Sequence, residues 1–205
     1  MPVKPTIFMV DDDPAVLKSL ARLLRSAGLA VETFPSSQAF LNHYLPHTPG
    51  CLVLDVAMPG LNGLELQKTL TAKDSAIPIV FLTGHGDIPM SVQAMKRGAV
   101  DFLTKPVNDD DLLAAVRAAI EKDHVARLAR AEVAEIEQCL ATLTPREREV
   151  LEHVVTGQMN KQIATQLGTV EKTIKVHRAR VMEKMKASSL AALVHLAERA
   201  GVGKK

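Results

Sequence analysis

The side chains best suited to chemistry are acids that end two apolar runs. Asp11 and Asp12 follow the run at residues 6–10, and Asp55 ends the run at residues 51–54. Runs this short and apolar are typical of strands buried on both faces of a parallel sheet. The acids would then lie at the carboxyl ends of strands, where open α/β sheets bind ligands. Carboxylates held together repel one another, which favours protonation or a bound cation.

Two more residues are expected at the same edge of the sheet. Thr83 ends the apolar run at residues 79–83, and Lys105 follows the run at residues 100–103. Asp11 and Asp12 offer the hard oxygen ligands that Mg²⁺ prefers. That cation would neutralise charge on an incoming phosphoryl group, so that Asp55 can attack phosphorus. The Thr83 hydroxyl can then hydrogen-bond one phosphoryl oxygen and the Lys105 ammonium can pair with another. The competing interpretation is that the acids, Asp13 included, only cap helices or lie in solvated turns.

The elements that must position these residues alternate along the first 120 residues. Strands are predicted at residues 7–10, 31–34, 52–55, 79–83 and 100–103. Helices are predicted at residues 14–27, from Ser36 or Ser37 to before Pro46, at 63–71, at 89–97, and from Asp109 or Asp110 onward. Five repeats of strand then helix indicate an α/β, doubly wound, five-stranded parallel sheet of the flavodoxin-like type.

The rest of the chain has a different pattern. Residues 122–143 lack Gly and Pro, and Val133, Ile136, Leu140 and Leu143 recur at helical spacing. This predicts a helical linker. Beyond Thr144-Pro145, short helices are predicted at residues 145–155, 161–167 (capped by Asn160), from Thr169 or Glu171 to 186, and 190–200. They indicate a small all-α, four-helix domain containing a helix-turn-helix. The predicted divisions are therefore residues 1–121, 122–143 and 144–205.

Charge is distributed unevenly along the 205 residues, although the net charge is only +2. Up to Lys122 there are 11 Lys and Arg against 13 Asp and Glu, a net of −2; from Pro145 there are 12 against 6, a net of +6. A basic tail favours a polyanionic partner. No apolar run has the length of a membrane span, and residues 1–5 do not read as a signal peptide. We therefore expect a cytoplasmic protein with Cys51 and Cys139 reduced.

Together these motifs resemble a bacterial two-component response regulator of the NarL/FixJ group, most of all the FixJ-like regulators. Such proteins join a receiver domain to a LuxR-type helix-turn-helix. The receiver motifs are Val10-Asp11-Asp12-Asp13, Leu54-Asp55 with Met58-Pro59-Gly60, Thr83-Gly84-His85-Gly86-Asp87, and Asp101-Phe102-Leu103 before Lys105-Pro106. The effector motifs are residues 143–151, Asn160-Lys161-Gln162-Ile163-Ala164, and Thr173-Ile174-Lys175-Val176-His177-Arg178. The resemblance covers nearly the whole chain.

The resemblance implies roles for particular receiver residues. Asp55 would be the phosphoacceptor, and Asp11, Asp12, Asp55 and the backbone carbonyl of Ala57 would bind Mg²⁺. The switch residues would be Thr83, Lys105 and Phe102, with a cis peptide before Pro106. One departure is Ala57, where close FixJ-like relatives carry Arg, and this bears on the lifetime of the phosphoryl group. His85 would either act on attacking water or be a solvated loop residue.

The resemblance also implies partners. A sensor histidine kinase would supply the phosphoryl group, and the phosphorylated protein would form a homodimer through the surface at residues 90–103. It would then bind double-stranded promoter DNA and act on RNA polymerase, as a regulator and not as an enzyme.

The DNA contacts expected from the basic tail lie mostly on one helix. In a helix-turn-helix the second helix enters the major groove. The candidates on it are Lys172, Thr173, Lys175, Val176 and Arg178, with Lys161 as a phosphate contact. A stripe of Ile174, Val181 and Met185 would face the core.

Two other functions compete. A phosphohydrolase with an Asp nucleophile would carry it on the first strand with a second Asp two residues later. Here Asp55 lies on the middle predicted strand and Ala57 stands two residues on. The second alternative is a DNA-binding protein whose receiver no kinase uses, and nothing in the sequence favours it.

Overall fold

The computed structural model describes residues 4–46, 48–84 and 88–203, with side chains in these ranges except at residues 88–91. The chain folds as two compact units, Met1–Arg127 and Leu128–Lys205. No helix in the described ranges is both long enough and apolar enough to cross a membrane.

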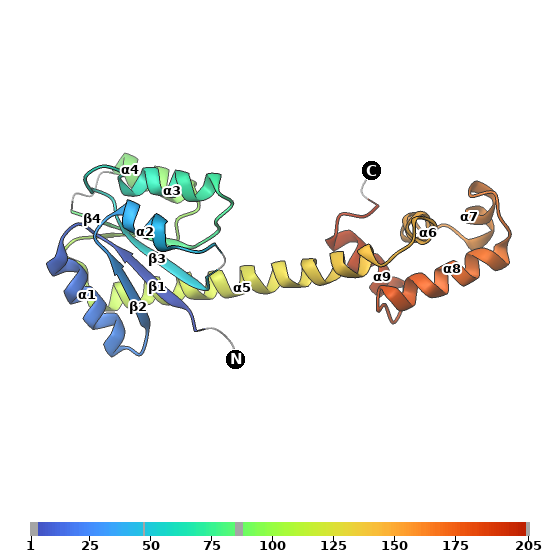
Figure 1. Ribbon diagram of the computed structural model, residues 1–205, viewed down its shortest axis with the longest axis horizontal. Coiled ribbons are helices and arrows are strands. Elements are labelled where there is room, and N and C mark those ends of the chain that lie inside the picture. Colours follow the sequence, from blue (N-terminus) through green and yellow to red (C-terminus); the bar gives the residue numbers. More distant parts are fainter. Residues whose placement is uncertain (1–3, 47, 85–87, 204–205) are drawn as a thin grey trace. The chain divides into compact units, whose positions relative to one another are not determined.

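The first unit is a parallel sheet covered by helices (Figure 1). The strands are β1 (Thr6–Val10), β2 (Ala30–Phe34), β3 (Gly50–Asp55), β4 (Ile79–Thr83) and β5 (Asp101–Thr104), in the order β2-β1-β3-β4-β5. The connecting helices are α1 (Pro14–Ser26), α2 (Ser37–His43), α3 (Gly63–Ala72), α4 (Ile88–Lys96) and α5 (Asp109–Ala141). The predicted doubly wound sheet is therefore confirmed.

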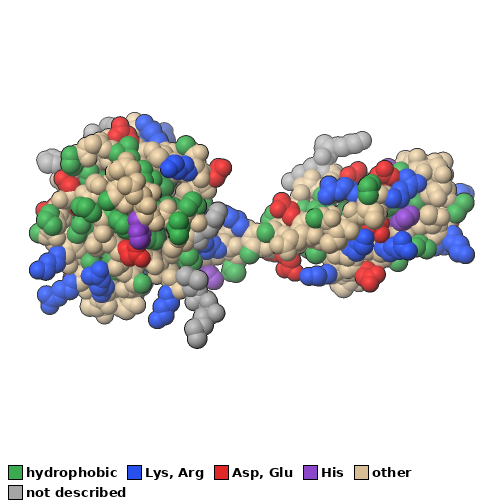
Figure 2. Space-filling model, in the orientation of Figure 1, with side chains coloured by type: hydrophobic (Ala, Val, Ile, Leu, Met, Phe, Trp, Pro, Cys, Tyr) green, Lys and Arg blue, Asp and Glu red, His purple; other side chains and the backbone are tan. Residues whose placement is uncertain are grey.

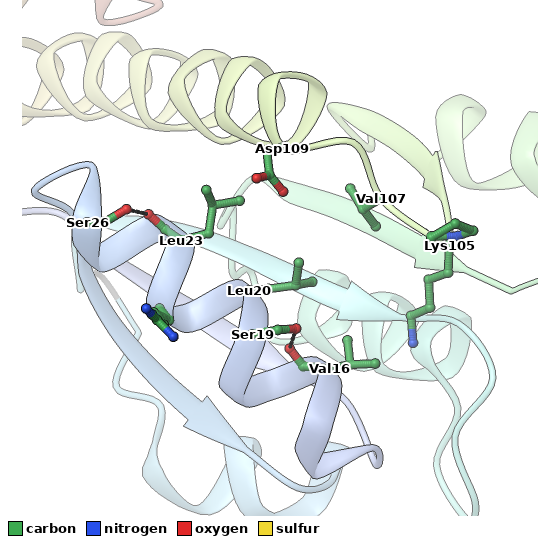
Figure 3. A pocket seen from close by; sticks show the side chains of 10 residues that line it. Val16, Ser19, Leu20, Leu23, Ser26, Lys105, Val107 and Asp109 are labelled. Atoms are coloured by element: carbon green, nitrogen blue, oxygen red, sulfur yellow. Dashed lines mark hydrogen bonds between the residues drawn. The ribbon is translucent and has the colours of Figure 1, made fainter.

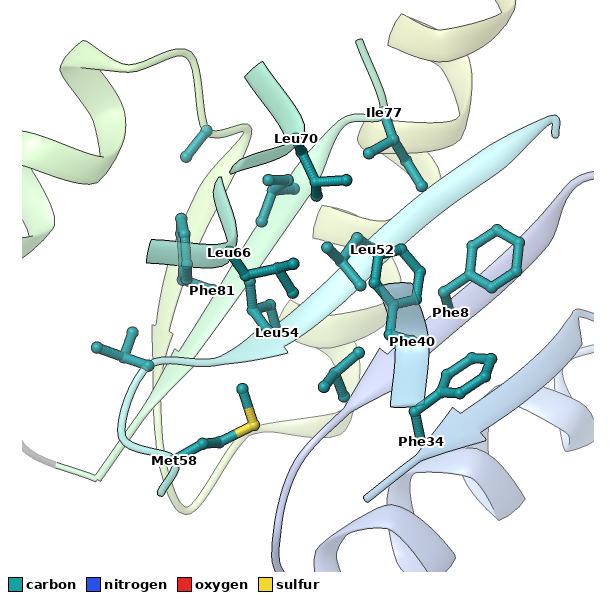
Figure 4. Packing of buried hydrophobic residues seen from close by; sticks show 14 of the residues in the cluster. Phe8, Phe34, Phe40, Leu52, Leu54, Met58, Leu66, Leu70, Ile77 and Phe81 are labelled. Atoms are coloured by element: carbon teal, nitrogen blue, oxygen red, sulfur yellow. The ribbon is translucent and has the colours of Figure 1, made fainter. Parts of the chain in front are cut away.

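Side-chain alternation along the strands fills a core on each face of the sheet. On β1, Phe8 and Val10 face one cluster, whereas Ile7 and Met9 face the other. The first cluster contains nearly all the aromatic residues of the chain (Figure 4). Phe8 packs edge-on against Phe40 at a centroid distance of 5.7 Å. Because every residue of β3 is buried, this strand forms the rigid centre that carries Asp55.

Helix α5 runs unbroken from Asp109 to Ala141, so the helix predicted from Asp109 or Asp110 onward and the predicted helical linker form one continuous helix. Asp109 is the first helical residue, as predicted, and the Asn108 side chain accepts from the Asp110 and Asp111 amides of the first turn. No Gly or Pro interrupts residues 109–141, so no local signal ends the helix near residue 121.

An ion pair between the buried Asp123 and the half-buried Arg127 fixes α5 to the sheet. The Asp123 carboxylate accepts from the Gly50 amide over 2.9 Å and from Arg127 Nε over 2.6 Å. Arg127 Nη2 donates to the Thr48 carbonyl over 2.6 Å. These bonds join α5 to the start of β3, at the end of the strand opposite Asp55.

The second unit is helical. Its helices are α6 (Pro145–Val155), α7 (Asn160–Gln166), α8 (Glu171–Lys184) and α9 (Leu190–Arg199). Ile136 and Leu140, near the end of α5, are buried in its core. The predicted inward stripe of α8 is confirmed, because Ile174, Val181 and Met185 are each at most 2% exposed. Helices α7 and α8, joined at Gly168, form the predicted helix-turn-helix.

Two helices of this unit begin with a side-chain cap: Thr144 caps α6 in a reciprocal capping box with Glu147, and Ser189 caps α9. The predicted cap of α7 is wrong, because Asn160 does not cap that helix. Asn160 is the first helical residue, the preceding residue is Met159, and the Gln162 side chain accepts from the Met159 amide over 2.8 Å. The Asn160 carboxamide oxygen accepts from Arg178 instead.

Candidate functional site

Three carboxylates meet at the carboxyl edge of the sheet. Asp11 follows β1, Asp12 comes next, and Asp55 is the last residue of β3. One carboxylate oxygen from each of the three lies within 4.8 Å of the others. Asp11 and Asp55 are only 2% and 4% exposed, whereas Asp12 is open to solvent. The sheet thus brings together the acids that the sequence placed there.

Lys105 contacts two of these three carboxylates. Its Nζ donates to Asp11 Oδ2 over 2.6 Å and lies 3.2 Å from Asp55 Oδ1. The second contact is an ion pair without hydrogen-bond geometry, so the buried Asp55 Oδ1 has no hydrogen-bond donor among the described residues. One ammonium faces three carboxylates, and the cluster therefore keeps a negative charge.

Burial and charge act in opposite directions on these groups. Burial raises the pKa of the Asp55 carboxyl, Lys105 opposes that rise, and the charge of Asp11 adds to it. Burial acts to lower the pKa of Lys105, but the hydrogen bond to Asp11 and the two carboxylate charges outweigh it and raise that pKa. The cluster therefore has too little positive charge for its carboxylates. An orphaned buried oxygen beside further hard oxygen ligands fits a small divalent cation such as Mg²⁺.

The remaining predicted receiver residues lie on β4, on β5 and in the segments that follow the strands. Thr83 ends β4, is 3% exposed, and accepts from the Lys105 amide through its carbonyl over 2.6 Å. Phe102 is half-buried on β5 against Phe81, at 6.1 Å between ring centroids. The Ala57 backbone acts to lower the pKa of the Asp55 carboxyl. His85 lies outside the described residues. The predicted cis peptide joins Lys105 to Pro106.

Two neighbours of the site have supporting roles. The Asp13 side chain accepts from the Ala15 and Val16 amides and caps α1, as the competing interpretation held for this acid. Gly63, at the start of α3, was not singled out from the sequence. A Cβ atom there would lie 2.3 Å from the Asp55 carbonyl oxygen, so only Gly lets α3 begin this close to Asp55. The local signal was the Asn-Gly pair that opens the helix.

The basic residues of the second unit divide into exposed and half-buried groups. Lys161, Lys172, Lys175 and Val176 are exposed, and Thr173 is half-buried. Lys and Arg side chains lie at many points on the surface of this unit (Figure 2). Lys175 forms an exposed ion pair with Glu171 at 3.2 Å. Arg178 differs from the others, because it is half-buried and bound to Asn160. The exposed group can reach a polyanion without rearrangement.

An acid-edged parallel sheet followed by a helix-turn-helix defines a receiver joined to a DNA-binding domain. Comparisons with known proteins agree. Residues 7–117 match the model of the response regulator receiver domain, and residues 141–197 match that of the bacterial regulatory proteins of the luxR family.

Relatives match over almost their full length. The solved structure of the response regulator StyR is 52% identical, with a TM-score of 0.87 over 96% of this chain and 99% of its own. Transcriptional regulatory protein FixJ of Bradyrhizobium diazoefficiens is 48% identical over 98% of each chain. Nodulation protein W of the same organism is 49% identical over 97% of this chain and 88% of its own. The chain belongs to the response regulators of the NarL/FixJ group, which are transcriptional regulators and not enzymes.

Proposed function

We propose that phosphorylation of Asp55 controls DNA binding by this regulator. The observation that carries the proposal is the buried Asp55 carboxylate, which shares Lys105 with Asp11 and keeps one oxygen without a hydrogen-bond donor among the described residues. A carboxylate paired incompletely and held at a strand end is available as a nucleophile.

The chemistry follows from the positions of the side chains. An Asp55 oxygen attacks phosphorus of a phosphohistidine, the P–N bond breaks with its electron pair going to the imidazole, and an acyl phosphate forms. Lys105 is placed to pair with one phosphoryl oxygen and Thr83 to donate to another. Mg²⁺, held by Asp11, Asp12, Asp55 and the Ala57 carbonyl, would supply neutralising charge at the phosphoryl group.

A groove beside Lys105 supports a protein as the phosphodonor. It has a volume of about 620 Å³ and lies between α1 and the segment that leads from β5 into α5. Figure 3 shows Val16, Leu20 and Leu23 of α1 facing Val107 across it, with Lys105 at one end. Apolar walls suit a helix of a partner such as a sensor histidine kinase. Lys105 lines both the groove and the acid cluster, so a docked donor would be near Asp55.

The output would be dimerisation and DNA binding. Phosphorylation would draw Thr83 inward and allow Phe102 to turn, changing the surface of α4 and β5, where Val92 and Met95 are each 45% exposed. Two effector domains would then engage two half-sites and gain affinity through effective concentration. We propose contacts to promoter DNA from Lys161, Lys172, Thr173, Lys175 and Val176, with Arg178 contributing at the same interface. RNA polymerase would be the final partner, and residues 1–121, 122–143 and 144–205 would be the receiver, linker and effector.

The decisive experiment is labelling from a phosphohistidine donor or acetyl phosphate. Wild type should label with Mg²⁺ and not after chelation, and Asp55→Asn should not label, because the amide lacks the nucleophilic oxyanion. Asp74→Asn is the matched control, since Asp74 is exposed in a turn. Labelling of Asp55→Asn at the wild-type rate would show that another residue is the acceptor.

Dimerisation needs a separate measurement. Sedimentation with beryllofluoride and Mg²⁺ should show a dimer for wild type and a monomer for Thr83→Ala. A wild type that stays monomeric while its DNA affinity rises would refute the dimer mechanism.

A further inference from the structure

The side chain of Arg178 lies against the start of α7. Its Nη1 donates to Asn160 Oδ1 over 3.1 Å, and both residues are half-buried. The two residues are 18 positions apart and belong to the two helices of the helix-turn-helix. The pair therefore fixes one helix of the motif against the other at a single polar contact.

The contact also determines which way the Asn160 amide faces. A guanidinium has only donors, so it must meet the amide oxygen and not the amide nitrogen. The Nδ2 group then lies on the other side of the amide. Within the part of the chain that the structure describes, Nδ2 donates no hydrogen bond and is not buried. Asn160 thus presents two N–H donors at the surface in a fixed orientation.

The surroundings of these donors suit an anionic oxygen. The next residue, Lys161, is exposed, and it forms no ion pair with a carboxylate in the described residues. Asn160 and Lys161 thus supply amide donors and a positive charge from successive positions at the start of α7, which suits a DNA phosphate group, since phosphate accepts hydrogen bonds and carries charge.

We propose that Asn160 donates to a DNA phosphate and that Arg178 is a positioning residue, which orients the Asn160 amide. This inference rests on DNA binding by the effector domain. It differs from the expectation that Arg178 contacts DNA through its own guanidinium. The two roles give different results, because a direct phosphate contact by a cation changes the salt dependence of binding and an oriented neutral donor does not.

The test uses the full chain and a duplex selected from random sequences for binding to it, with Kd measured over a range of KCl concentrations. Asn160→Ala should weaken binding about 10-fold, since a hydrogen bond to a charged acceptor is lost, and should leave the salt slope unchanged. Arg178→Ala should weaken binding to a similar extent. The double variant should be no weaker than Arg178→Ala, because both changes remove one oriented donor.

Asn160→Asp separates the donor role from a structural one. The carboxylate can still accept from Arg178, so the contact between the helices is kept, but Asp has no donor and repels phosphate. We expect at least a 10-fold loss of DNA affinity with no loss of thermal stability. Gln166→Glu places the same charge at an exposed position of α7 and should change Kd much less.

Three outcomes would overturn the inference. Wild-type affinity in Asn160→Asp would remove Asn160 from the phosphate contacts. A salt slope reduced by about 0.9 in Arg178→Ala would show a direct phosphate contact by Arg178. Additive losses in the double variant would show that the two residues act independently. In each case, steep salt dependence of the wild type would leave DNA binding itself intact.

Discussion

Glu147 is the residue through which the stability of the effector domain should depend on pH. It is 2% exposed, and its Oε2 accepts from the Thr144 amide over 2.9 Å and from Lys184 Nζ over 2.6 Å. The Lys184 hydrogen bond, followed by that of Thr144, lowers the pKa of Glu147 from 4.5 to about 2. One carboxylate thus joins the start of α6 to the end of α8.

The contribution of Glu147 to the free energy of unfolding can be estimated from the lowering of its pKa. A pKa lowered from 4.5 to about 2 corresponds to about 3 kcal/mol, at 1.36 kcal/mol per pKa unit. The Glu147 carboxylate is covered by its neighbours but lies close to the protein surface, and the Lys184 side chain is 32% exposed. Solvent screening therefore reduces the contribution of Glu147 to about 1–2 kcal/mol. Since the folded-state pKa is the lower one, the stabilisation is complete above pH 4.5 and is lost as pH falls towards 2.

Glu147→Gln should therefore lower the free energy of unfolding by about 1–2 kcal/mol at pH 7, because Gln keeps an acceptor for Thr144 and loses the charge. The difference in unfolding free energy between wild type and Glu147→Gln should become smaller as pH falls below 4.5. The control is Glu149→Gln, which removes the exposed ion pair with Arg146 at 2.8 Å and should cost less than about 0.5 kcal/mol.

The assay can separate the two units of the intact chain. The second unit has no Trp, Tyr or Phe, and the one Tyr is Tyr44 in the first unit. In urea titrations, Tyr44 fluorescence therefore follows the receiver alone, while far-ultraviolet circular dichroism follows the helices of both units. Two results would refute the reasoning. One is a loss of unfolding free energy in Glu147→Gln no larger than that in Glu149→Gln, and the other is a difference between Glu147→Gln and wild type that stays constant in acid.

Three further variants test other parts of the structure. In Gly63→Ala, the added Cβ would lie 2.3 Å from the Asp55 backbone carbonyl oxygen. We therefore expect the receiver to lose about 1–3 kcal/mol of stability in the Tyr44-detected transition and Asp55 to label more slowly. Unchanged labelling would contradict this. Asp123→Ala should cost about 1–3 kcal/mol in the same transition, because the buried Gly50 amide loses its acceptor and Arg127 loses one of its partners. A smaller cost than that of Glu149→Gln would contradict this. Lys175→Ala should weaken operator binding in gel-shift titrations by about 1–3 kcal/mol if it reads a base, and unchanged affinity would exclude it.

Local patterns were sufficient for the architecture of the chain. Apolar runs of the right length predicted β1, β3, β4 and β5 within a residue or two, and their carboxyl ends placed Asp11, Asp55, Thr83 and Lys105 at one edge. The prediction worked because parallel strands in a doubly wound sheet all end at the same side. The parallel arrangement of the strands therefore brings together residues that are far apart in the sequence, such as Lys105 and Asp11, which are 94 positions apart.

Polar partnerships were less predictable, because a side chain that can cap a helix can also bind elsewhere. Asn160 has the right type and position for a cap, yet Arg178 engages its oxygen from another helix. Likewise, Asp123 accepts from an amide 73 positions away, and only its i,i+4 spacing to Arg127 was visible in the sequence. Such contacts depend on how elements pack, which residue spacing along one element does not encode.

In the proposed switch, the short segment of residues 105–109 connects the acid cluster, the groove proposed for the phosphodonor and the start of α5. Lys105 contacts both Asp11 and Asp55, and its amide donates to the Thr83 carbonyl at the end of β4. Lys105, Val107 and Asp109 line the groove proposed for the phosphodonor, and Asp109 begins α5. A phosphoryl group adds close to two negative charges and would compete with Asp11 for Lys105. Because only three residues separate Lys105 from the start of α5, a change in its partners would act directly on the helix that carries Ile136.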